Sequence, residues 1–236
     1  TQGATHVKGW TKHGPAMNPF IFGFFEHMRH EGYSQRFPQT FIRYEADTLP
    51  DLNGQIVVGM SLTNRVQASR VLKDTSSFRT VDTDALITTD DKGFRPVDIE
   101  QGPDGAIYLA DSFQHRIVRL DPQTHVATLF AGTGKAGFGG DGGPADQAQF
   151  NITMCGTLSP DGAFMTIADI GNHRVRRIDL KTRVVTTLAG NGQKGLPKDG
   201  DDALNAPMGD VPATCVAKDG TVYALLRGGN ALVAVK

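Results

Sequence analysis

The first side chains that could do chemistry stand in the N-terminal segment. His27 and His30 would share one face if this segment were helical, with Glu26 and Glu31 beside them. Imidazole and carboxylate groups bind metals, but a metal site needs ligands that converge from distant parts of the chain. We therefore assign no metal ligand, and the alternative is a surface segment without a metal. Two further histidines of the segment could contribute to such a site, His6 and His13.

Two glycine-rich stretches, Gly132–Gly137 and Gly190–Gly195, carry the pattern G-x-G-x-x-G. In dinucleotide-binding proteins this pattern follows a strand and opens a helix within a βαβ unit. No amphipathic helical pattern follows either stretch, so we interpret both as loops. Their carboxylates could bind calcium, but they lack the alternating spacing of an EF-hand and are expected to be solvated turns. These carboxylates are Asp141, Asp199, Asp201 and Asp202.

The chain has two cysteines, Cys155 and Cys215, which excludes a disulfide-rich scaffold and a cysteine-based zinc site. It contains no CxxCH sequence and so no haem attachment motif. Both cysteines fall on expected strands. We expect buried free thiols rather than a disulfide, because cysteine packs as a small apolar residue.

Composition excludes several classes of partner. The 24 Lys and Arg nearly balance the 25 Asp and Glu, and a net charge of -1 offers no electrostatic surface for nucleic acid. No apolar run approaches about 18 residues, so we expect no transmembrane segment. Hydrophobic residues make up 39% of the chain, which is enough for a core. The unusual feature is glycine, with 28 residues of 236.

The glycines recur with a fixed period. Asp104-Gly105 matches Asp161-Gly162, and the residues that follow match at an offset of 57 or 58. A third copy begins at Asp219-Gly220 and a weaker one at Asn53-Gly54. A period of this length indicates repeated supersecondary units.

Each unit consists of short apolar or alternating runs separated by turn signals. In the unit that contains Gly105 these runs are 95–101, 106–110, 116–120 and 126–130. The Asp-Gly pair between two runs predicts a hairpin with a type I′ turn, in which φ is positive at both central residues.

Four antiparallel strands per repeat are typical of a propeller blade. We therefore predict an all-β propeller of four-stranded antiparallel blades over residues 39–236, preceded by a non-repeating segment, 1–38. The expected blades are 39–90, 94–133, 150–191 and an incomplete 210–236.

His115 and His173 occupy equivalent positions in two of the repeats. A residue that recurs at a structural period is expected to do structural work, such as bonding a backbone group of the neighbouring blade. We therefore propose neither histidine as a catalytic base.

The repeats resemble those of NHL propellers, through Gln114-His115-Arg116, Asn172-His173-Arg174 and the pattern around them over residues 94–236. Residues 18–115 are similar to membrane-bound dehydrogenases related to the soluble quinoprotein sugar dehydrogenases. The similar stretches are NPFIFGFFEHM, LPDLNGQIVVGMSLTNRV and DKGFRPVDIEQGPDGAIYLADS. This second resemblance implies a six-bladed, exported protein, periplasmic or extracellular. It also implies pyrroloquinoline quinone (PQQ) and calcium as cofactors and a small-molecule sugar or alcohol as substrate.

By the same resemblance, Arg95 stands where these dehydrogenases place an arginine on the carboxylates of the quinone. Thr63 and Val97 replace two further cationic residues of that set, so Arg95 is the one cofactor-binding residue carried over. Its alternative role is a hydrogen bond between blades. No stretch matches the one that holds the catalytic histidine of those enzymes, and the catalytic residues stay unassigned.

Two functions remain open from the sequence. One is an exported PQQ-dependent sugar or alcohol dehydrogenase, in which the cofactor supplies the redox chemistry. The other is a non-catalytic NHL propeller that binds or assembles other molecules through loops on a rigid scaffold. The last unit has three expected strands, and a propeller closes to remove its edges. We therefore expect another protein chain, or further blades of the same protein, as a partner.

Overall fold

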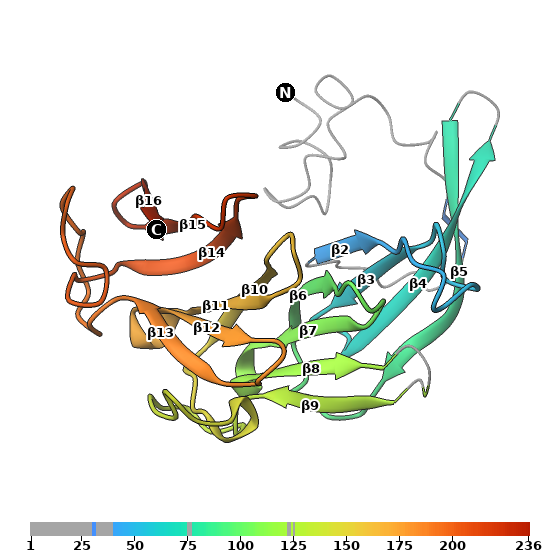
Figure 1. The fold of residues 1–236 in the computed structure, drawn as a ribbon. Helices are drawn as coiled ribbons and strands as arrows, with labels where there is room; N and C mark the ends of the chain where they lie inside the picture. The colour runs from blue at the N-terminus through green and yellow to red at the C-terminus, as the bar shows by residue number, and fades with distance from the viewer. Residues whose placement is uncertain (1–29, 32–39, 75–76, 122–123, 125) are drawn as a thin grey trace, which may run out of the picture.

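The computed structural model describes residues 30–31, 40–74, 77–121, 124 and 126–236. It confirms the all-β propeller class, because four separate sheets follow one another in an arc (Figure 1). Helix in the described residues is limited to three short 3₁₀ turns, Ser112–Gln114, Ala145–Gln147 and Ile170–Asn172. None of the helical segments in this part of the chain could cross a lipid bilayer.

The second and third sheets are four-stranded antiparallel meanders in sequence order. The four expected strands of the second sheet are confirmed, each within one residue of its predicted bounds. That sheet holds β6 (Pro96–Gln101), β7 (Ile107–Asp111), β8 (Arg116–Leu120) and β9 (Ala127–Ala131). The third sheet holds β10 (Thr153–Leu158), β11 (Phe164–Asp169), β12 (Arg174–Asp179) and β13 (Val185–Ala189).

The first and fourth sheets depart from this pattern. The first has five strands in the order β1-β5-β4-β3-β2, because the short strand β1 pairs in parallel with β5. Its strands are β1 (His30–Glu31), β2 (Thr40–Arg43), β3 (Ile56–Met60), β4 (Arg65–Asp74) and β5 (Ser77–Thr88). The fourth sheet has three strands, β14 (Asp210–Val216), β15 (Val222–Arg227) and β16 (Ala231–Val235).

His30 and Glu31 form strand β1, so the helical condition for a shared metal-binding face is not met at these two residues. Strand pairing with β5 satisfies their backbone groups in place of a helical turn. The other candidate metal ligands of that segment lie outside the described residues. These are His6, His13, Glu26 and His27.

The core forms layers between successive sheets. Side chains alternate along a strand, so one strand contributes to the layer on each side of its sheet. On β7, Ile107 and Leu109 pack into the cluster shared with the first sheet. Tyr108 and Ala110 of the same strand pack into the cluster shared with the third sheet. Because successive side chains point to opposite faces, a strand buried on both faces shows a continuous apolar run. All five residues of β7 are buried.

The glycine of each repeat lies in the hairpin between the first two strands of a sheet, as expected, but the type I′ turn is wrong. In the second sheet Gly105 donates its N–H to the Gly102 carbonyl at 2.9 Å, and its φ is +79°. Asp104 is not among the residues with positive φ. The reason is that Pro103 fixes a negative φ at the first central position, so only the glycine adopts the left-handed conformation.

Cys215 lies on β14 and is a free thiol, but it is exposed, so its predicted burial is wrong. Its neighbour Thr214 is buried, and alternation along the strand turns Cys215 to the other face. The side chain of Cys155 is outside those that the structure describes.

Candidate functional site

Arg95 stands immediately before β6, the first strand of the second sheet. Its guanidinium donates a hydrogen bond to the backbone carbonyl of Ser61, which follows β3 of the first sheet. Its backbone N–H donates to the Asp111 carboxylate at 2.7 Å. The side chain is half-buried and links two neighbouring sheets.

The residues around Arg95 do not fit a quinone that carries carboxylates. Such a group needs several cationic donors. Here one guanidinium already donates to Ser61, and the carboxylates of Asp98 and Glu100 follow on the same strand. Val97 packs against the core between the second and third sheets.

Asp98 brings together the first strands of three sheets. One carboxylate oxygen accepts a hydrogen bond from the Thr40 hydroxyl of β2 at 3.5 Å, and the other accepts the Gly156 N–H of β10 at 3.0 Å. Glu100 lies two residues further along β6. Burial, which removes water from its carboxylate, raises the pKa of Glu100 to about 7, and the charge of Asp98 adds to this effect.

The repeated histidines stand at the turn between the second and third strands of their sheets. His115 has a φ of +51°, and its Nδ1 accepts the N–H of Ile152, just before β10, at 2.9 Å. The expected structural role is thereby confirmed for His115. In the first sheet Asn64 takes this position, with a φ of +53°, and donates to the carbonyls of Asp91 and Phe94. The left-handed turn thus aims a polar side chain at the next sheet each time.

His173 repeats the geometry of His115 without repeating the bond. Its φ is +50°, and its Nδ1 lies 3.6 Å from Oδ1 of Asp210, the first residue of β14. No described residue hydrogen-bonds this nitrogen. His173 therefore faces the next sheet, as the repeat predicts, but its contact there is with a carboxylate.

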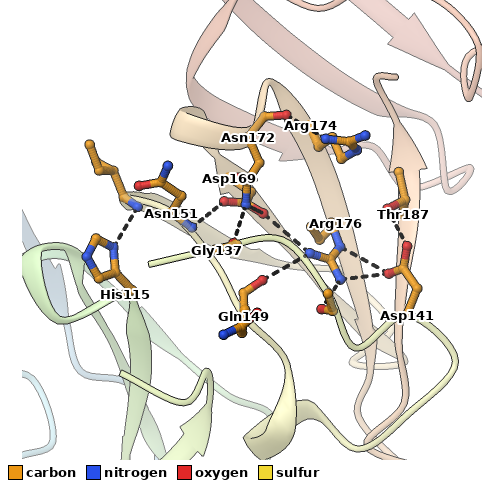
Figure 2. A network of polar contacts seen from close by, with 12 residues as sticks. His115, Gly137, Asp141, Gln149, Asn151, Asp169, Asn172, Arg174, Arg176 and Thr187 are labelled. Atoms are coloured by element: carbon orange, nitrogen blue, oxygen red, sulfur yellow. Dashed lines mark hydrogen bonds and ion pairs between the residues drawn. The ribbon is translucent and has the colours of Figure 1, made fainter. Parts of the chain in front are cut away.

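Arg176 on β12 is fully buried and anchors the first glycine-rich loop (Figure 2). Its Nη2 lies 2.7 Å from Oδ1 of Asp141 and donates to the Gly139 carbonyl at 3.1 Å. Asp141 lies in a turn and is exposed, as expected, and it also forms this ion pair and accepts the Thr187 hydroxyl at 2.6 Å. The repeat pattern does not mark Arg176, because Val118 stands at the equivalent position of the preceding sheet.

Asp169 ties the same loop to the strand ends of the third sheet (Figure 2). Its carboxylate accepts the Asn151 N–H at 2.7 Å and the Asn172 side-chain amide at 2.8 Å. Asn172 also donates to the Gly137 carbonyl at 2.7 Å. Burial raises the pKa of Asp169, and these hydrogen bonds and the nearby Arg176 act against that rise.

The two G-x-G-x-x-G stretches are loops, as expected, and they have the same internal hydrogen bonds. Gly132 N–H donates to the Ala145 carbonyl, and Gly190 N–H donates to the Ala203 carbonyl, each at 2.8 Å. In the second loop Asp201 and Asp202 accept backbone N–H groups within their own turns, and Asp199 is exposed. Across the described ranges, no three His, Cys, Asp or Glu side chains gather as a metal site would require.

These loops and turns share one end of the sheets, because the first strand begins where the second ends. Pro96 of β6, for example, pairs with Asp111 of β7. We call this surface the loop face. It consists of residues 61–64, 89–95, 112–115, 137–139, 149–152 and 170–173.

Three large apolar side chains of the loop face are exposed to solvent. Phe113 is 72% exposed, Phe138 is 46% exposed and Ile152 is 41% exposed. The guanidinium of Arg174 lies 3.8 Å above the ring of Phe138. Phe113 is two residues from His115, whose imidazole holds the backbone of Ile152.

A cavity of about 880 Å³ lies at the opposite end of the first sheet, against the β2–β3 hairpin. Leu49, Leu52, Arg70 and Asp84 are among its lining residues. None of the site residues expected from the sequence lines it.

A family model described as a domain of unknown function, DUF7133, matches residues 25–131. Among curated proteins, the chain is similar to SUPPRESSOR OF QUENCHING 1, chloroplastic, of Arabidopsis thaliana, with 39% identity over 36% of this chain and 8% of that protein. It is also similar to NHL repeat-containing protein 2 of Bos taurus, with 34% identity over 35% of this chain and 11% of that protein. The chain thus covers about a tenth of the length of these relatives.

Solved structures share the fold at low sequence identity. A structural genomics protein of unknown function from Bacteroides thetaiotaomicron matches with a TM-score of 0.57 and 17% identity, over 75% of this chain and 43% of that one. An auxiliary nutrient binding protein from the same organism matches with a TM-score of 0.55 and 19% identity, over 73% of this chain and 42% of that one. Together with the repeats and the four sheets, these similarities establish that the chain has the fold of an NHL-type β-propeller.

Proposed function

We propose that this chain is a non-catalytic propeller whose loop face binds a polypeptide partner. The observation that carries the proposal is the exposure of Phe113, Phe138 and Ile152 on loops that polar contacts hold in place. Solvent-exposed aromatic side chains beside arginine are the composition of the energetically important centre of protein interfaces.

The contacts beneath these residues support a surface that is ordered before it binds. Ile152 is fixed by His115, and the backbone on either side of Phe138 is fixed by Asn172 and Arg176. Ordering of loops is one of the main free-energy penalties of association, so a loop already held by its own scaffold binds more tightly.

The quinoprotein function rests on sequence resemblance, and the described residues around Arg95 give it little support. Arg95 is engaged with Ser61, and Thr63 and Val97 supply no further cation for a carboxylated cofactor. The binding function uses apolar side chains that the structure leaves exposed on the loop face.

Selection from a displayed random-peptide library on the immobilised protein tests the proposal. Selected peptides should lose about tenfold or more in affinity when Phe113→Ser is introduced, because truncation of a central apolar anchor removes about 2 kcal/mol or more. Phe78→Ser is the matched control. Phe78 is 58% exposed near the start of β5, at the end opposite the loop face, and its substitution should leave affinity within about twofold. Peptides that bind both variants equally well would refute the loop face as the binding surface.

A further inference from the structure

The cavity of about 880 Å³ beside the β2–β3 hairpin lies where the two long strands of the first sheet run past its shorter ones. Strand β4 has 10 residues and β5 has 12, whereas β3 has 5. Val66 and Ala68 of β4 pack into the core shared with the second sheet. Side chains two residues apart share a face of a strand, so Arg70 extends from the same face one step beyond that core. The cavity is therefore the open end of the layer between the first and second sheets.

The floor of the cavity is apolar. Leu49 and Leu52, from the turn between β2 and β3, and Leu120, from the end of β8, line it and are each at most 8% exposed. Leu86 of β5 packs against the same core and also lines the cavity. Covering this floor is favourable for a ligand that brings apolar groups of its own, so the ligand has an apolar body.

Charged side chains of both signs line the same cavity. They are the guanidinium of Arg70 and the carboxylates of Asp51 and Asp84. All three residues are exposed, and within the described part of the chain none of these charged groups has an ion pair or a hydrogen bond. The guanidinium of Arg119 on β8, in contrast, pairs with two carboxylates. The cavity thus offers one cation and two anions to a ligand.

The walls of the cavity are held by contacts that need no ligand. The side-chain amide of Gln55, a residue that is 5% exposed, donates to the Asp51 carbonyl and accepts the Thr83 hydroxyl of β5 at 3.0 Å. The Tyr44 hydroxyl donates to the Gly105 carbonyl at 2.8 Å, which ties the β2–β3 hairpin to the second sheet. Preformed cavities of about 300 to 1,000 Å³ are typical of sites for small molecules.

We propose that this cavity binds a short apolar peptide whose two termini are free. Arg70 binds the C-terminal carboxylate, because a guanidinium matches a carboxylate with two parallel hydrogen bonds. Asp51 and Asp84 supply the negative charge for the N-terminal ammonium, and the leucine floor takes the apolar side chains.

Volume and charge together separate this ligand from simpler ones. A single apolar amino acid carries the same two charges, but a cavity of about 880 Å³ suits a larger ligand, of about three residues. A fatty acid lacks the ammonium that the two carboxylates call for, and a sugar lacks the apolar groups that the leucine floor calls for.

Isothermal titration calorimetry of the full chain with trileucine tests the proposal. We expect saturable binding that weakens about tenfold when the peptide is N-acetylated, and about tenfold when its C-terminus is amidated. Each change removes hydrogen bonds to a charged group. Triserine keeps both termini without apolar side chains and should bind more weakly than trileucine by about tenfold or more.

In the protein, Arg70→Gln should weaken trileucine binding about tenfold. It should leave the binding of trileucine amide within about twofold, because the amide has no carboxylate for Arg70 to bind. Lys73→Gln is the matched control. It removes the same charge from the opposite face of the same strand, away from the cavity, and should leave trileucine binding within about twofold.

Trileucine that does not bind, or that binds no better than its amide and is indifferent to Arg70→Gln, would overturn the proposal. Decanoate that binds more tightly than trileucine, and only with Arg70 intact, would refute the ammonium contact and identify a fatty acid as the ligand. The peptide comparison uses wild-type protein, so it does not depend on the folding of a variant. The cavity shares no residue with the loop face, so Phe113→Ser should leave trileucine binding unchanged, and the two proposals can fail separately.

Discussion

The Nη2 of Arg176 lies 2.7 Å from Oδ1 of Asp141, which joins a fully buried guanidinium of the third sheet to the glycine-rich loop that precedes that sheet. The loop is long and has no strand of its own. Its order therefore depends on a few polar anchors, and this pair is one of them.

Asp141→Ala should destabilise the fold by about 2 kcal/mol, because it leaves the buried Arg176 without its closest counter-charge. This is below the usual cost for a fully buried pair, since the Asp141 side chain is 37% exposed and water can compensate in part. Urea unfolding measures the change. Asp199→Ala, at the equivalent position of the second loop, is the control and should stay within about 0.5 kcal/mol of the wild type. Equal effects of the two substitutions would contradict the anchoring role.

His115→Ala should lower the free energy of unfolding by about 1 to 2 kcal/mol. The substitution removes the acceptor of the Ile152 N–H and places alanine at a φ of +51°. His115→Asn should be the milder change, because asparagine tolerates this backbone conformation and stands there in the first sheet as Asn64. Chemical denaturation of the two variants side by side gives the comparison. An asparagine variant less stable than the alanine variant would argue against a role set by the turn.

The stability of the protein should fall as pH rises through the range set by Glu100. Burial raises its pKa from an ordinary 4.5 to about 7, so between these values the folded protein holds a proton that the unfolded chain releases. Glu100→Gln removes this proton binding. The variant should therefore gain on the wild type with rising pH, by about 2 kcal/mol between pH 4 and pH 8 after allowance for partial exposure. Urea unfolding at both pH values measures the gap, and a gap that does not change with pH would show that Glu100 titrates normally.

PQQ and Ca²⁺ added to the protein, with an aldose and a redox dye, should give no dye reduction. The reason is that Arg95, the one residue carried over from the quinoprotein dehydrogenases, donates to Ser61, while Thr63 and Val97 replace the other two cationic residues. Arg95→Ala is the informative variant. Turnover that requires PQQ and disappears in Arg95→Ala would establish the oxidoreductase function and overturn the binding one.

The repeat pattern predicted the strands of the second sheet and the structural use of His115, because both follow from what recurs along the chain. Arg176 could not be predicted in this way. Its counterpart in the preceding sheet is Val118, so no period marks it, and its partner Asp141 lies 35 residues away in the sequence. The meeting of Thr40, Asp98 and Gly156 likewise depends on the packing of three sheets. The predicted type I′ turn is wrong for a local reason, because Pro103 precedes Asp104-Gly105 and holds φ negative at the first central position.

Hydrogen exchange with and without a library-selected peptide tests the binding function most directly. The account predicts that the peptide slows amide exchange in residues 112–115 and 137–152, which carry Phe113, Phe138 and Ile152, and that Phe113→Ser abolishes this protection. Protection that appears instead around Leu49 and Leu52 in the cavity of the first sheet, and is indifferent to Phe113, would contradict it.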